Sequence, residues 1–218
     1  MSLKDLIIVG AGGFGRELAV WAPGALGYGT DWFFKGYIDD DVSAVGGSIL
    51  EKDKVDSDLL LGRIHDFTPG ESDVLVCAIA DPFERERVVS SLRDKGGRFV
   101  NFIHRTALLA PDLLIGTGNI VCPFVTITCS VSVGNYNIFN SKTSVGHDVS
   151  IGDFNSIMGA CNIGGGARIA DKCFLGTQSV VMPNVKVGSS SKIGTGSVAI
   201  RAVPSGVTVF GCPAKRIT

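Results

Sequence analysis

An aliphatic residue recurs at every sixth position over almost half of the chain, and this repeat limits the possible folds more than any other feature. From Ile103 to Ile193, sixteen consecutive sixth positions hold fifteen aliphatic residues and one phenylalanine, without an insertion. The next residue is often glycine, and the fourth after the aliphatic is usually small or asparagine. Hexapeptide periodicity is the signature of a parallel β-helix, in which each repeat supplies one strand and one corner. With three hexads per coil, we predict about five coils.

Two further expectations follow from that periodicity. The aliphatic residues should stack inside the helix as ladders, and the glycines should occupy corners whose backbone would strain other residues.

The distribution of charge along the chain indicates where the β-helix begins. Residues 1–98 hold 11 Lys+Arg and 17 Asp+Glu, whereas residues 99–218 hold only 9 and 4. We therefore predict one domain over residues 1–102 and the β-helix, with a C-terminal tail, over residues 103–218.

Composition excludes several classes of protein. With 45% hydrophobic and 19% charged residues, the chain is not intrinsically disordered. The balance of 20 basic and 21 acidic residues gives no electrostatic footprint for nucleic acid. No apolar run reaches the ~18 residues of a membrane span, and the N-terminus does not resemble a signal peptide. The six cysteines lack C-x-x-C and zinc spacings, so we expect reduced thiols in a cytoplasmic protein and no metal.

A glycine-rich motif lies near the N-terminus. Residues 6–9 form a short apolar run that predicts a buried strand, and Gly10-Ala11-Gly12-Gly13-Phe14-Gly15 follows at once, before a helical pattern over residues 16–21. In this context the first glycine permits a tight turn, the second lets backbone approach a phosphate, and the third lets the helix pack on the strand. The helix N-terminus then offers N–H groups to an anion.

The rest of this region predicts a small Rossmann-like βαβ domain. We expect strands at residues 33–38, 74–79 and 99–103 and a helix over about 82–95. Asp39 and Asp40 follow the second strand, where acidic residues commonly accept hydrogen bonds from a nucleoside. The domain is short for a dinucleotide. A nicotinamide cofactor, a purely structural glycine turn and a different nucleotide, such as a nucleotide sugar, remain open interpretations, with the last favoured.

The repeat, together with the closing Gly211-Cys212-Pro213-Ala214-Lys215-Arg216-Ile217, resembles the left-handed β-helix acyltransferases. With the glycine loop included, the whole chain is similar to bacterial nucleotide-amino-sugar N-acetyltransferases and the related sialic acid O-acetyltransferases. The resemblance implies an α/β Rossmann-like domain followed by a left-handed parallel β-helix, a homotrimer, acetyl-CoA as donor, and active sites in clefts between neighbouring β-helices.

Acetyl transfer needs a general base, and the chain has three histidines. His65 lies in a polar linker and is expected at the surface, while His104 is expected to shape the domain junction. His147 stands two places after an inward aliphatic, so it should point outward, and on spacing alone it could simply be solvated. The stretch G-H-D-x-x-I-G-D-F at residues 146–154 matches the family's catalytic motif. That resemblance makes His147 the base and Asp148 its electrostatic partner.

The resemblance also implies the ligand contacts. The pantetheine arm of CoA is expected along backbone at Gly165, Gly176-Thr177 and Gly194-Thr195. Ser156 replaces a second family histidine; its hydroxyl can bond the thioester oxygen but cannot share proton transfer. Gly12, Gly13 and Phe14 should hold the nucleotide, with Asp39 and Asp40 on its base or ribose. Phe14 stands where relatives often carry histidine, which leaves the acceptor's identity open.

The predicted function is N-acetylation of a nucleotide-linked amino sugar in bacterial surface glycan biosynthesis. Direct attack of the amine on the thioester is favoured, because no cysteine or serine is expected to stand beside the base as a covalent nucleophile. The first alternative is O-acetylation of sialic acid or another glycan sugar. More distant alternatives are a nicotinamide-binding oxidoreductase and a non-catalytic β-helix scaffold.

Overall fold

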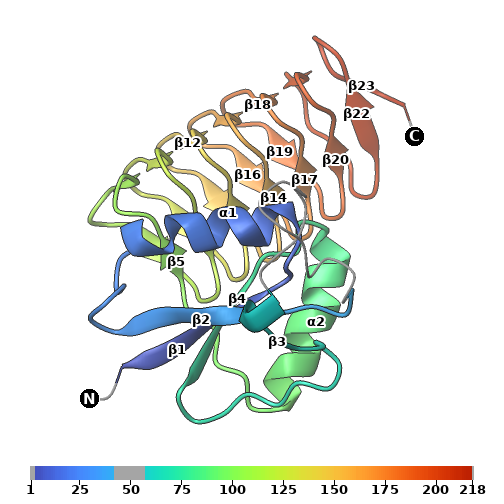
Figure 1. Ribbon diagram of the computed structural model, residues 1–218. Coiled ribbons are helices and arrows are strands. Elements are labelled where there is room, and N and C mark those ends of the chain that lie inside the picture. Colours follow the sequence, from blue (N-terminus) through green and yellow to red (C-terminus); the bar gives the residue numbers. More distant parts are fainter. Residues whose placement is uncertain (1–2, 42–56, 218) are drawn as a thin grey trace, which may run out of the picture. The chain divides into compact units, whose positions relative to one another are not determined.

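The structure, a computed structural model, describes residues 3–41 and 57–217 (Figure 1). The chain divides into two compact units. One comprises residues 1–80 and 84–101, and the other comprises residues 81–83 and 102–218. No helix among the described residues is long and apolar enough to cross a membrane.

The N-terminal unit contains a four-stranded, wholly parallel sheet in the order β3-β2-β1-β4. Its elements are β1 (Lys4–Val9), α1 (Gly13–Trp21), the 3-10 turn η1 (Ala22–Gly24), β2 (Trp32–Ile38), the 3-10 turn η3 (Ser57–Leu59), β3 (Leu60–Gly62), β4 (Asp73–Cys77) and α2 (Pro82–Asp94). This arrangement confirms the predicted strand–glycine loop–helix unit at the N-terminus.

The apolar run at residues 6–9 forms most of β1, a central strand of the sheet. Leu6, Ile7, Ile8 and Val9 are all fully buried, so both faces of the strand are covered. A parallel strand covered on both faces has a continuous apolar run rather than an alternating one. The run at residues 6–9 therefore marks the middle of this sheet.

The prediction of a strand of this domain at residues 99–103 is wrong. Phe99 makes only an isolated bridge to Leu75, and β5 (Phe102–Ile103) pairs with β8 (Ile120–Val121) in the β-helix. The fourth strand of the N-terminal sheet is instead β3, at the edge beside β2. The edge strand β3 has only three residues, too few to show a strand pattern in the sequence. The apolar run 99–103 looked like one strand, but its first part contacts the N-terminal sheet and its last two residues belong to the β-helix.

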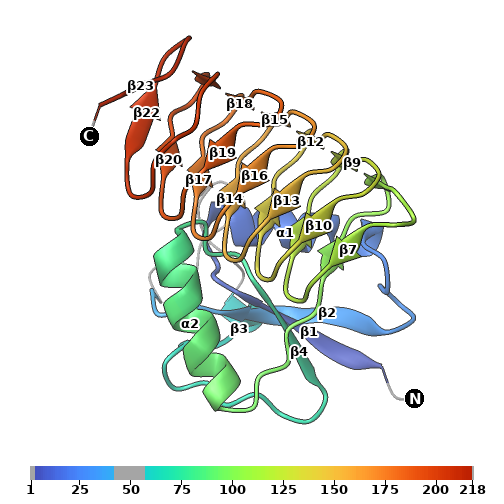
Figure 2. The same ribbon diagram turned by 180° about the vertical axis from the view of Figure 1, so that it is seen from behind.

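The C-terminal unit is the predicted parallel β-helix, and Figure 2 shows its coils as successive rungs. Two-residue strands recur every six residues and form three sheets. The first holds β5, β8, β11 (Ile138–Phe139), β14 (Ser156–Ile157), β17 (Phe174–Leu175), β20 (Lys192–Ile193), β22 (Thr208–Phe210) and β23 (Lys215–Arg216). The second holds β6 (Leu108–Leu109), β9 (Thr126–Ile127), β12 (Ser144–Val145), β15 (Asn162–Ile163), β18 (Val180–Val181) and β21 (Val198–Ala199). The third holds β7 (Leu114–Ile115), β10 (Ser132–Val133), β13 (Ser150–Ile151), β16 (Arg168–Ile169) and β19 (Lys186–Val187).

Each residue of a strand pairs with the residue one coil, or 18 positions, further on, as Phe139 pairs with Ile157. The sixth-position residues point inward: Phe139, Ile157 and Leu175 are all fully buried. The register shortens at the end, because Ile193 pairs with Val209. The strict six-residue repeat therefore stops where the last coil becomes shorter.

The expectation that glycines occupy the strained corners is wrong in its physical reason. Most left-handed corner residues are not glycine; Tyr136 and Lys142, for example, have φ of 56° and 62°. The glycine directly after the inward aliphatic is needed because the next coil is too close. A Cβ at Gly134 would lie 2.7 Å from the carbonyl oxygen of Gly152. Close stacking of coils, and not backbone strain, selects glycine there.

Three buried asparagines stack inside the first coils. Asn119, Asn137 and Asn155 are fully buried and lie on successive coils. The side-chain oxygen of Asn119 accepts hydrogen bonds from the backbone N and Nδ2 of Asn137, at 2.9 and 3.1 Å. Asn137 accepts in the same way from Asn155, at 2.8 and 3.0 Å. This ladder satisfies polar groups inside an otherwise apolar core.

Candidate active site

His147 lies at the corner that follows β12. Val145 points into the core, and His147, two residues later, points outward with 67% of its side chain exposed. Its Nδ1 lies 2.7 Å from Oδ2 of Asp148. Asp148 adopts the left-handed conformation, with φ of 59°, which aspartate tolerates better than most residues. This turn brings together the side chains of two consecutive residues, which in a strand would point to opposite faces.

The pair has the geometry of a general base. A carboxylate at Nδ1 holds the ring hydrogen on that nitrogen, so the lone pair of Nε2 is left to accept a proton. The structure thus brings together the two residues that the sequence motif predicted.

We expect Asp148→Asn to lower kcat about fivefold, because an exposed charge pair contributes up to about 1 kcal/mol. Asparagine also tolerates positive φ, so the corner itself should persist. Steady-state kinetics measure kcat, and thermal unfolding checks that the variant keeps its fold. An unchanged kcat would remove the carboxylate from the mechanism.

The 18-residue coil places two further residues beside His147. The backbone N–H of Asp148 donates to the carbonyl oxygen of Cys129, at 3.2 Å, and Gly166 donates to the carbonyl oxygen of His147, at 2.8 Å. Cys129 is an exposed free thiol. The expectation that no cysteine neighbours the base holds only along the sequence, since Cys129 occupies the same corner one coil earlier. Counting back 18 residues is the signal that would have found it.

The predicted CoA residues divide between two corners. Gly165 shares the corner of His147, whereas Thr177 and Thr195 stack on adjacent coils at the corner after the first sheet, where Gly196 N donates to Thr177 O at 2.9 Å. Gly176 and Gly194 precede those threonines and share their corner. Within the described residues, the backbone N–H groups of Gly165, Thr177 and Thr195 donate no hydrogen bond. Gly165 is half-buried, and Thr177 and Thr195 are exposed.

Ser156 is placed differently. It lies in β14 of the first sheet and is fully buried, whereas His147 lies at an exposed corner beyond the second sheet. One chain therefore does not bring Ser156 and His147 together, and the Ser156 hydroxyl has no open face in this structure.

The glycine loop of the N-terminal unit has the predicted form. Gly10 has φ of 101°, and a Cβ at Gly15 would overlap the carbonyl oxygen of Gly10, so close helix–strand packing requires this glycine. Gly12 and Gly13 are exposed, and a Cβ on either would meet nothing within 4 Å. Phe14 is half-buried. The outer side of the loop is open at the N-terminus of α1, as an anion site requires.

Asp39 and Asp40 make different contacts. Oδ2 of Asp39 accepts the N–H of Ala11 at 2.6 Å, so this carboxylate holds the glycine loop. Oδ1 of Asp40 lies 3.0 Å from Nδ1 of His65, whose Nε2 lies 3.0 Å from Asp66. Desolvation acts to raise the pKa of Asp40, but hydrogen bonds and positive charge from His65 outweigh it and lower that pKa.

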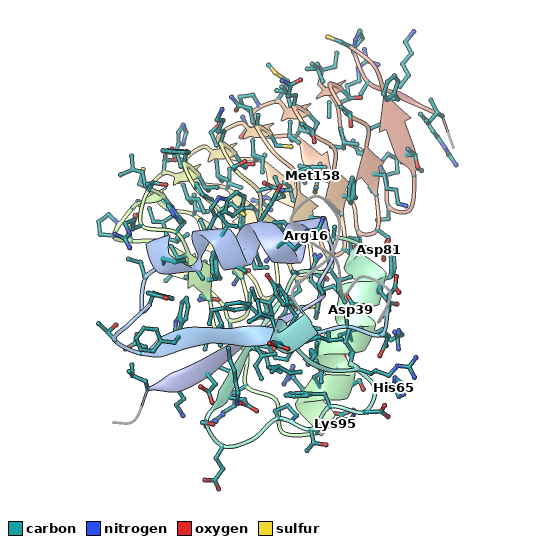
Figure 3. The ribbon with its side chains drawn as sticks, viewed as in Figure 1. Arg16, Asp39, His65, Asp81, Lys95 and Met158 are labelled. Atoms are coloured by element: carbon teal, nitrogen blue, oxygen red, sulfur yellow. The ribbon has the colours of Figure 1, made fainter. Side chains whose placement is uncertain are left out.

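His65 is exposed, as predicted, and it bridges Asp40 and Asp66, which was not predicted from the sequence. Figure 3 shows Asp39 and His65 in the part of the N-terminal unit where β2 and β3 end. Nζ of Lys95 donates to the carbonyl oxygens of His65 and Phe67. Asp39 and Asp40 thus follow β2 at its carboxyl end, where ligands of parallel sheets bind.

Comparison with known proteins connects these features. The chain is 31% identical over 145 residues to GDP-perosamine N-acetyltransferase of Escherichia coli O157:H7, an alignment that covers 64% of this chain and 66% of that enzyme. The acetyltransferase domain of PglB from Neisseria gonorrhoeae superposes with a TM-score of 0.85, at 24% identity and with 98% of this chain and 100% of the domain covered. This chain therefore has the fold of the left-handed β-helix acetyltransferases.

A second solved structure of this fold was determined with two ligands bound. A histidine-to-alanine variant of GDP-perosamine N-acetyltransferase from Caulobacter crescentus was solved with CoA and GDP-perosamine. It superposes with a TM-score of 0.83, at 24% identity, over 100% of this chain and 98% of that one. The matched segments span 66% of the first curated relative and 16% and 21% of the next two. No family profile matches the chain.

Cysteine and acidic side chains supply no metal site in the described part of the chain. No three His, Cys, Asp or Glu residues converge there on a position where an ion could bind. Burial raises the pKa of Cys77 and of Cys173 to about 11, so both thiols stay protonated and unreactive.

Proposed function

We propose that this chain is an acetyl-CoA-dependent N-acetyltransferase that acts on the amino group of a nucleotide-linked amino sugar in bacterial surface glycan biosynthesis. The hydrogen-bonded His147–Asp148 pair at an exposed β-helix corner carries this proposal. It is supported by the relatives named as sugar N-acetyltransferases. In this scheme residues 1–102 bind the nucleotide and residues 103–218 perform acyl transfer.

The reaction proceeds by direct attack. The amine nitrogen forms a bond to the thioester carbonyl carbon, the C–S bond breaks, and Nε2 of His147 accepts the proton that the amine loses. That proton then passes to the CoA thiolate, so the products are an N-acetyl sugar and CoA. Asp148 keeps the imidazole oriented throughout. A transient acetyl adduct on Cys129, seen by intact mass, would instead favour a two-step route.

The residues fit CoA as cosubstrate. The N–H groups of Gly165, Thr177 and Thr195, which donate no hydrogen bond within the described residues, can bond the amide oxygens of the pantetheine arm. These groups occupy two corners of one β-helix. We therefore propose a homotrimer in which two neighbouring chains form each site. We also propose that the enzyme is cytoplasmic, with reduced thiols.

A panel of acceptors distinguishes the candidate activities. Thiol release from acetyl-CoA should appear with nucleotide-linked amino sugars and be absent with their hydroxyl analogues. Release with hydroxyl acceptors alone would establish O-acetylation of a glycan sugar instead. Quenching of NADH fluorescence would support the oxidoreductase, and failure to bind CoA would leave a β-helix scaffold.

The glycine loop offers a second test. We expect Asp39→Ala to raise the KM for the nucleotide sugar about tenfold, equivalent to ~1.4 kcal/mol, because the loop loses its hydrogen bond at Ala11. The KM for acetyl-CoA should not change. Asp94→Ala, which removes the same charge from the exposed end of α2, is the control. Equal effects of the two substitutions would remove the loop from nucleotide binding.

A further inference from the structure

Gly165 occupies the corner directly above His147 in the β-helix. It follows β15, which pairs with β12, and the two strands are neighbours in Figure 2. The hydrogen bond from Gly166 N to His147 O, at 2.8 Å, fixes the spacing of the two corners. The imidazole of His147 therefore lies against the backbone of the next coil.

The backbone conformation does not require glycine at this position. Gly166 has a positive φ of 70°, but Gly165 does not lie in the left-handed region. The limiting factor is the histidine ring. A Cβ at Gly165 would lie 2.8 Å from both Cε1 and Nε2 of His147. Carbon atoms in contact normally lie about 3.5–4.0 Å apart.

The ring is thus bounded on two sides. Asp148 holds its Nδ1 edge through the 2.7 Å contact, and the bare Cα of Gly165 lies over the face of the ring at the Cε1–Nε2 bond, since a Cβ there would also lie 3.2 Å from Cδ2. A methyl group at Gly165 would have to displace the ring, because the alternative is overlap with the nitrogen that accepts the proton. The exposed ring can move, so the coil itself would not be distorted.

We propose that Gly165 is a positioning residue for His147: the missing side chain forms the slot that keeps Nε2 in line with Asp148. This inference rests on the proposed function for its kinetic consequence, but not for its structural one. It gives Gly165 a role beyond the backbone contact to CoA.

Gly165→Ala is the direct test, with Gly159→Ala as a matched control. A Cβ at Gly159 would meet only the carbonyl oxygen of Ser141, at an ordinary 3.5 Å. We expect Gly165→Ala to lower kcat about 100-fold, as misplacement of a catalytic group by about 1 Å does. The Kd for CoA should stay within about twofold, because alanine keeps the backbone N–H. Gly159→Ala should match the parent chain, and both variants should keep its unfolding temperature.

A double-mutant cycle separates positioning from a direct role. If Gly165 acts through the imidazole, Gly165→Ala should cost no further activity in a His147→Ala background. A full 100-fold loss in that background, or a raised Kd for CoA, would overturn the proposal and leave Gly165 as a cosubstrate contact only.

Nuclear magnetic resonance tests the slot without any turnover. The chain has three histidines, so single substitutions assign their imidazole signals. In the parent chain His147 should show the tautomer with hydrogen on Nδ1, and Gly165→Ala, but not Gly159→Ala, should abolish that signature. An unchanged His147 spectrum would contradict the proposal. If the parent chain acetylated nothing while this spectrum still responded, the proposed function would fail and the slot would stand.

Discussion

His147→Ala should lower kcat by about 10²–10⁴-fold, the range expected when a general base is removed. No second histidine stands at this corner to replace Nε2, because the other two histidines are His65 and His104. CoA affinity should not change, because the open backbone N–H groups lie at other residues. Steady-state kinetics with acetyl-CoA measure kcat, and calorimetric titration with CoA measures its Kd.

His104→Ala is the matched control for that experiment. His104 bonds Thr106 at 2.8 Å, and burial lowers the pKa of its imidazole. Within residues 3–41 and 57–217 no carboxylate contacts its ring, so its loss should change kcat by less than about twofold. Near-normal turnover in His147→Ala would show that the base lies elsewhere.

Asn137→Ala should give the largest loss of stability, about 3 kcal/mol. Oδ1 of Asn137 accepts from both the backbone N and Nδ2 of Asn155, and the substitution leaves both buried donors without an acceptor. Each such orphan costs about 1–3 kcal/mol. Urea unfolding followed by circular dichroism measures the change in the free energy of unfolding.

The exposed Asn162 on β15 supplies the control for the asparagine ladder. Asn162→Ala removes the same side chain from a strand surface and should alter stability by no more than about 0.5 kcal/mol. If Asn137→Ala were as mild as this control, the ladder would not stabilise the β-helix core.

The β-helix was predictable because its signal is local. Every sixth residue, such as Phe139 or Ile157, points into the core. This pattern can be read from the sequence without knowing which coils are neighbours. The role of Gly134 was not predictable in the same way. Only the coil above shows that a side chain there would meet Gly152, so the reason for glycine lies 18 residues away.

The candidate site likewise contains contacts that were predictable from neighbouring residues and contacts that were not. His147 and Asp148 are consecutive, and their pairing follows from a local left-handed corner. The contact of Asp40 with His65 spans 25 residues and depends on how parallel strands end side by side. The sequence motif therefore predicted the His147–Asp148 pair, whereas the contact between Asp40 and His65 could be found only from the folded sheet.

The mass of the acceptor after incubation with acetyl-CoA tests the central claim most directly. The chain should add one acetyl group to a nucleotide-linked amino sugar, at its amine, and His147→Ala should leave that mass unchanged over the same time. An acceptor that gains the acetyl group equally in both reactions, or gains it only on a hydroxyl, would contradict the assignment of His147 as the base of a sugar N-acetyltransferase.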